Sequence, residues 1–187
     1  STNKNVNETL YNSLFHIQHR GQDSHGVLTS DNENLYFIKE SGLINNSTKN
    51  ISILKGTIGI GHVRYKTSGS LVNKEIQPFI INNIALCHNG NISNYNKINK
   101  VGLNFKTDSD SELLLLLFQK ELSKHNKLND KIIVSVIKTI SKICIGSFSV
   151  IILIKNYGLI CFKDPYGIRP LVYGKKENTY LISSESP

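Results

Sequence analysis

Apolar residues recur every three or four positions in several stretches of the chain, the spacing of helices that bury one face. The clearest stretch starts at Ser109, a residue type that caps helices, with Glu112 three positions later as in a capping box. Its leucines, together with the isoleucines of the next stretch, predict two helices stacked on one side of a sheet. The predicted helices cover Val6–His19, Ser93–Val101, Ser109–Leu122 and Asp130–Ile143.

Short apolar or alternating runs, bounded by Gly, Asn, Asp and Ser, predict strands between and after these helices. The first two are separated by the turn-like segment Asp31–Asn34 and form a hairpin pattern. A helix, then strands, then helices and more strands favours an α+β layered domain over a parallel βαβ series. The predicted strands are Gly26–Ser30, Leu35–Ile38, Ile58–Val63, Phe79–Ile81, Ile84–Cys87, Phe148–Ile154, Leu159–Lys163, Leu171–Tyr173 and Tyr180–Ser183.

The size and composition of the chain suit a single globular domain. Its 187 residues, 39% of them hydrophobic, suffice for one core over residues 1–187. No apolar run approaches the roughly 20 residues of a membrane-spanning helix, so we expect no membrane segment. The polar stretch from Ser1 to Glu8 holds no apolar secretory core, which predicts a cytoplasmic setting.

Charge and cysteine content exclude other classes of function. The net charge of +8 comes from lysines that are scattered rather than gathered in a stripe, so we expect a solvated basic surface and no nucleic-acid partner. Cys87, Cys144 and Cys161 each lie in an apolar stretch, and no pair has ligand spacing. We therefore expect buried free thiols, with no disulfide and no metal site.

The segment His88-Asn89-Gly90 follows directly on an apolar strand. At a strand end the Asn89 amide and the Gly90 N–H can point the same way and form an oxyanion hole, which stabilises the negative oxygen of a tetrahedral intermediate. The competing interpretation is a type I′ turn, since Asn-Gly is the commonest sequence for it.

Arg64 and Asp110 complete a candidate binding site. Arg64 follows another predicted strand, and its planar guanidinium suits a carboxylate, although a surface salt bridge is an equally simple explanation. Asp110 lies in the first turn of a predicted helix, where it either caps the helix or pairs with an ammonium group. Together with an oxyanion hole, these residues describe a site for an α-amino acid that reacts at a side-chain carbonyl.

As a set, the polar segments resemble the class II, or N-terminal-nucleophile, glutamine amidotransferases over nearly the whole chain. Within this group they are most similar to amidophosphoribosyltransferases, because glucosamine-phosphate relatives typically read Tyr-Arg-Gly-Tyr-Asp where this chain has His19–Asp23. The resemblance implies a four-layer αββα sandwich. The motifs that carry it are Ile17–Asp23, Gly61–Gly69, Gln77–Phe79, His88–Asn94, Thr107–Glu112 and Lys163–Gly174.

Carried over by position, the resemblance implies that Arg64 holds the α-carboxylate of glutamine and Asp110 its α-ammonium. Asn89 and Gly90 become the oxyanion hole. The stretch from Tyr65 to Gln77 resembles the loop that closes over glutamine, with Tyr65 and Thr67 expected to contribute polar contacts.

The family's nucleophile is a cysteine at the mature N-terminus, and this chain has none there. Ser1 is an unsuitable replacement because the polar residues after it cannot form a buried strand, and Cys87 has no obvious base. We expect a first strand resembling Cys-Gly-Ile-Val-Gly-Ile just before Ser1, so the chain as given lacks its nucleophile and is inactive. Loss of amidase activity is the alternative explanation.

The resemblance also implies partners beyond this domain. We expect a C-terminal phosphoribosyltransferase domain, which uses magnesium and makes phosphoribosylamine for purine synthesis from the ammonia released here, in a homo-oligomeric enzyme. No cofactor is expected in the glutamine domain itself. The alternatives are another class II enzyme, such as a glucosamine-phosphate synthase, and an inactive glutamine-binding or regulatory module.

Overall fold

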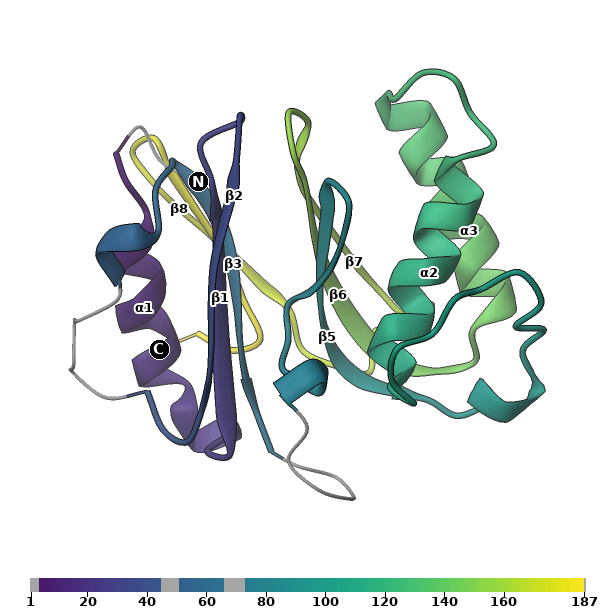
Figure 1. Cartoon of the computed structure of the whole chain (residues 1–187), viewed down its shortest axis with the longest axis horizontal. Helices are drawn as coiled ribbons and strands as arrows, with labels where there is room; N and C mark the ends of the chain where they lie inside the picture. The colour runs from purple at the N-terminus through teal and green to yellow at the C-terminus, as the bar shows by residue number, and fades with distance from the viewer. Residues whose placement is uncertain (1–3, 45–50, 66–72, 187) are drawn as a thin grey trace.

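Two antiparallel sheets pack face to face, with one helix outside the first sheet and two helices outside the second (Figure 1). This computed structural model describes residues 4–44, 51–65 and 73–186. The layer order is helix, sheet, sheet and helix pair, so the predicted αββα sandwich is confirmed. No helix of the described residues is long and apolar enough to cross a bilayer.

The first two layers come from the N-terminal part of the chain. Helix α1 (Asn7–His16) covers a three-stranded sheet of order β2-β1-β3, in which both neighbours run antiparallel to the central strand. The strands are β1 (Ser24–Ser30), β2 (Leu35–Ser41) and β3 (Ile58–Arg64). The register pairs Ser24 with Arg64, which places the end of β3 beside the start of β1.

The second sheet has four strands in the order β4-β5-β6-β7 and carries the helix pair on its outer face. A separate two-stranded ribbon, β8 with β9, follows in the chain. The elements are β4 (Phe79–Ile81), β5 (Ile84–Ile92), α2 (Asp110–Leu122), α3 (Asp130–Ile143), β6 (Gly146–Ile154), β7 (Gly158–Lys163), β8 (Val172–Lys176) and β9 (Thr179–Ser183).

Each of the three spaces between layers has its own hydrophobic core. The largest joins α2 and α3 to the second sheet, a second joins α1 to the first sheet, and a third, around Leu28, Ile60 and Leu153, lies between the sheets. Because α2 is apolar on every side from Leu113 to Phe118, it is buried all round, as expected of an interior helix. Close packing of the sheets fixes β3 relative to β5.

Most predicted elements are confirmed, and α3 begins and ends at the predicted residues. The predicted helix at Ser93–Val101 is wrong, since only a single 3₁₀ turn forms at Tyr95–Lys97. The prediction that a strand ends at Cys87 is also wrong. Strand β5 continues to Ile92 because β6 pairs with it as far as Gly146, and this ladder overrides the low strand propensity of Asn and Gly.

The predicted capping box at the start of α2 forms only in part: Ser109 caps the helix, but Glu112 does not bond back to the cap. The Ser109 hydroxyl accepts the N–H of Ser111 at 3.3 Å. The Glu112 carboxylate instead accepts the N–H groups of Lys106 and Thr107, which precede the cap. Glu112 therefore holds the segment that leads into the helix.

Candidate functional site

A cavity of about 880 Å³ lies where β3 of the first sheet faces β5 and β6 of the second. Its wall contains five of the six predicted site residues, which come from three separate parts of the chain. Thr67, the sixth, lies outside the described residues. The five are Arg64, Tyr65, Asn89, Gly90 and Asp110.

Asn89 and Gly90 lie within β5, so the type I′ turn considered from the sequence does not form. Gly90 is opposite Phe148 of β6. Both backbone groups of Phe148 turn toward β7, where the N–H donates to the Asp164 carboxylate and the carbonyl accepts the Asp164 N–H. Because opposed residues of an antiparallel pair alternate between bonded and non-bonded positions, the Gly90 N–H points away from β6.

Two further N–H groups point to the same side of β5, away from β6, and we call this side the outer edge of β5. The N–H of His88 donates to Gln77 Oε1 at 2.6 Å, and the N–H of Ile92 donates to Asp110 Oδ2 at 3.0 Å. The Gly90 N–H lies between them on this edge, and Gly90 lines the cavity. An N–H group held in this way suits a developing negative charge.

Only glycine fits at position 90. Its φ angle is +151°, and a Cβ added there would lie 2.0 Å from the Ser147 carbonyl oxygen and 2.7 Å from the Phe148 Cα. Both atoms belong to the backbone of β6, which cannot move aside like a flexible side chain. The close approach of the two strands thus explains the glycine of the Asn-Gly pair.

Asp110 occupies the first position of α2, where the helix dipole favours a carboxylate. One of its oxygens, Oδ2, accepts the Ile92 N–H, while Oδ1 lies 3.6 Å from His88 Nδ1. The helix start and the end of β5 are therefore joined by this side chain. Asp110 lines the cavity, and its side chain is 24% exposed.

Arg64 ends β3, and its side chain is only 16% exposed, so it does not belong to an ordinary surface salt bridge. Its Nη2 donates to Glu75 Oε2 at 2.8 Å. This partner was missed from the sequence because eleven positions separate the two residues. Tyr65 is half-exposed and donates its hydroxyl to the His19 carbonyl at 3.3 Å.

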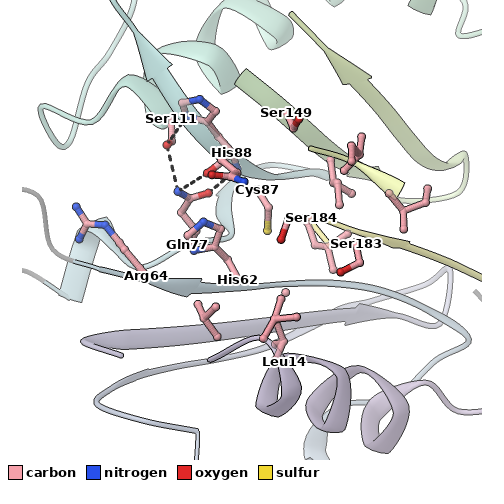
Figure 2. A pocket seen from close by; sticks show the side chains of 18 of the residues that line it. Leu14, His62, Arg64, Gln77, Cys87, His88, Ser111, Ser149, Ser183 and Ser184 are labelled. Atoms are coloured by element: carbon pink, nitrogen blue, oxygen red, sulfur yellow. Dashed lines mark hydrogen bonds between the residues drawn. The ribbon is translucent and has the colours of Figure 1, made fainter. Parts of the chain in front are cut away.

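Two histidines, the partly buried His62 and the buried His88, also line the cavity (Figure 2). Burial lowers the pKa of His62 to about 4, and the neighbouring His88 adds to the effect. Burial also lowers the pKa of His88, against the opposing effect of the Asp110 carboxylate. Both imidazoles are therefore neutral at pH 7.

The three cysteines are not activated nucleophiles. Cys87 lines the cavity, but burial raises the pKa of its thiol far above the usual range. Burial also raises the pKa values of Cys144 and Cys161 to about 12. Because the thiolate is the reactive form, none of these three thiols suits the role of a nucleophile. Within the described part of the chain, no group of three or more ligand side chains is arranged for a metal ion.

The layered fold and a cavity with a guanidinium, a carboxylate and an edge N–H define an amidotransferase type of domain. A family model described as a glutamine amidotransferase domain matches residues 62–187. The chain belongs to this family of glutamine amidotransferase domains.

The relatives it matches carry a more particular name. The amidophosphoribosyltransferases of Pseudomonas aeruginosa and Escherichia coli are each 38% identical to it over 97% of the chain. The chain spans 40% and 39% of the lengths of these two proteins. The predicted resemblance to amidophosphoribosyltransferases is thus confirmed.

Solved structures agree with this assignment. The glutamine phosphoribosylpyrophosphate amidotransferase from B. subtilis, complexed with ADP and GMP, matches with a TM-score of 0.81 and 31% identity, over 97% of this chain and 40% of that one. A predicted glutamine amidotransferase from Pseudomonas aeruginosa, 15% identical with a TM-score of 0.54, shows a likeness of fold alone.

Proposed function

We propose that the cavity binds L-glutamine and presents its side-chain amide to the outer edge of β5. Arg64 binds the α-carboxylate, Asp110 binds the α-ammonium, and Gly90 and Asn89 donate to the amide oxygen. The observation that carries this proposal is that a cation, an anion and an edge N–H from three segments line one cavity. Tyr65 and Thr67 are proposed as additional polar contacts to the substrate.

In the proposed reaction, a thiolate attacks the amide carbon of glutamine, and the oxygen becomes negative in the tetrahedral intermediate. Donation by Gly90 and Asn89 stabilises this charge, and the loss of one such donor typically costs about 10²–10³ in rate. The intermediate expels ammonia and leaves a γ-glutamyl thioester, which water hydrolyses to glutamate. The α-amine of the nucleophilic cysteine acts as the general base: it takes the thiol proton and passes it to the amide nitrogen that leaves as ammonia.

We propose that this cysteine belongs to a strand preceding Ser1, as the family resemblance implies. The high pKa values of the chain's own thiols support this proposal, because they leave the reaction without a thiolate. The chain as given then binds glutamine without hydrolysing it.

For the whole protein, we propose that the ammonia passes to a C-terminal phosphoribosyltransferase domain. That domain uses magnesium and converts phosphoribosyl pyrophosphate to phosphoribosylamine for purine synthesis, in a homo-oligomeric enzyme. The names of the relatives and His19–Asp23, which differs from the motif of glucosamine-phosphate enzymes, support this acceptor. The free cysteines suit a reducing, cytoplasmic setting.

The test is to place Cys-Gly-Ile-Val-Gly-Ile before Ser1 and to measure ammonia release from glutamine. We expect hydrolysis by the extended chain and none after alanine replaces the added cysteine. Calorimetry of the chain as given should show glutamine binding. Binding without hydrolysis in the extended chain would favour the inactive module, and the absence of both would refute the proposal.

A further inference from the structure

Gln77 lies at the position where the ladder between β4 and β5 stops. The register pairs Phe79 with Leu86, and its continuation places Gln77 opposite His88. Pro78 has no N–H to donate. The side-chain amide of Gln77 takes over the exchange that two opposed backbone residues would make. Its Oε1 accepts the His88 N–H at 2.6 Å, and its Nε2 donates to the His88 carbonyl at 3.1 Å.

The same amide reaches the start of α2. Gln77 Nε2 lies 3.2 Å from Ser111 Oγ, and this oxygen lies 3.0 Å from His88 Nδ1 (Figure 2). Ser111 directly follows Asp110, the proposed partner of the ammonium. Gln77, His88 and Ser111 are each at most 5% exposed, so water does not replace the contacts between their side chains.

Gln77 is also linked by the chain to the third part of the site. It follows Glu75, whose carboxylate holds Arg64, by two positions. One buried amide therefore touches the strand that carries Gly90 and the helix start that carries Asp110, and it is two residues from the partner of Arg64. A displacement of about 1 Å in such a framework can cost about 10²-fold in rate.

We propose that Gln77 is a positioning residue, which sets the distance between the oxyanion donor of β5 and the ammonium site on α2. This inference rests on the proposed function. Without the amide, the N–H and carbonyl of His88 lose their partner on the outer edge of β5, and Gly90, two residues further along, keeps only the restraint of the β6 ladder. The rate of hydrolysis should then fall more than glutamine binding does.

The kinetic test uses the chain extended with Cys-Gly-Ile-Val-Gly-Ile. We expect Gln77→Leu to lower kcat about 10–100-fold, up to the loss of about 10²-fold typical of a misplaced catalytic group, with a much smaller change in KM. Gln119→Leu removes an amide from the far end of α2 and should leave both constants unchanged. Rates are expressed per folded molecule, with the folded fraction taken from circular dichroism.

Gln77→Glu supplies a pH-dependent readout. A protonated carboxyl can accept the His88 N–H and donate to the His88 carbonyl, whereas a carboxylate cannot donate. Relative to the unsubstituted chain, the kcat of this variant should rise as the pH falls. A kcat for Gln77→Leu within twofold of the unsubstituted chain, or a loss that follows the folded fraction alone, would overturn the positioning role.

The Gly90 amide resonance separates the two hypotheses. If the extended chain releases no ammonia, the proposed function fails. The positioning role of Gln77 is then tested by NMR spectra of the chain as given. A Gly90 amide shift that moves in Gln77→Leu but not in Gln119→Leu supports positioning of β5. An unmoved Gly90 resonance contradicts it.

Discussion

Replacing Gly90 with alanine tests the close approach of β5 to β6. The new Cβ would lie 2.0 Å from the Ser147 carbonyl oxygen, and the backbone would keep a φ of +151° that side chains disfavour. Such backbone strain costs about 1–3 kcal/mol, and overpacking costs about 1–3 kcal/mol more. We expect the free energy of unfolding to fall by about 2–6 kcal/mol in total.

Gly158 provides a matched control. Its φ of +134° is similarly unfavourable for alanine, but an added Cβ would meet no atom within 4 Å. Gly158→Ala therefore retains the backbone strain and omits the clash. The difference between the two variants should be about 1–3 kcal/mol, or about 2–12 °C in Tm for a chain of this size.

Urea unfolding followed by circular dichroism is the appropriate assay, because the chain contains no tryptophan. Equal m-values would show that the two variants differ in stability rather than in the compactness of the unfolded state. If Gly90→Ala and Gly158→Ala lose the same free energy, the clash with the β6 backbone does not exist. The explanation for glycine at position 90 would then be wrong.

Three further predictions follow from the site and its supports. Asp110→Asn should weaken glutamine binding about 10–100-fold, measured by calorimetry. Asp130→Asn, at the same position of α3, should leave binding unchanged. If the two variants bind glutamine equally well, Asp110 does not belong to the site. Between pH 6.5 and 5 the unfolded state protonates His62, whereas the native state, with its pKa near 4, does not. Stability to urea should therefore fall by about 2 kcal/mol over this range, and His62→Gln should reduce this dependence. Ser109→Ala removes the cap of α2 and should cost about 1 kcal/mol in the same urea assay; an unchanged midpoint would mean that the cap is dispensable.

Local patterns in the sequence predicted the layers well. The predicted bounds of helix α3 match the observed ones, since its isoleucines repeat along one buried face, and the structure adds Asn129 as its cap. The failure at Ser93–Val101 has a local cause too. Polar residues dominate that segment, and one side chain, Asn94, bonds to the Ile143 carbonyl and the Ile145 N–H instead of supporting a helix.

The site was predicted less completely, since its polar partners come from distant segments. Residue type and family resemblance predict Arg64, Asn89, Gly90 and Asp110 as site residues, and the fold brings them to one cavity. Glu75, Gln77, His88 and Ser111 received no individual role, because their importance depends on contacts across 11 to 34 positions. The Gln77–Phe79 motif was the signal available in the sequence, but it does not reveal where the amide points.

The carboxylate of Asp110 is restrained, because one of its oxygens accepts the Ile92 N–H. Arg64 is likewise restrained by Glu75, and Gly90 is restrained by the strand ladder. In the proposed binding mode, these three restrained groups form a chiral frame around the α-carbon of the bound amino acid. The domain should therefore bind one enantiomer of glutamine in preference to the other before any bond is broken.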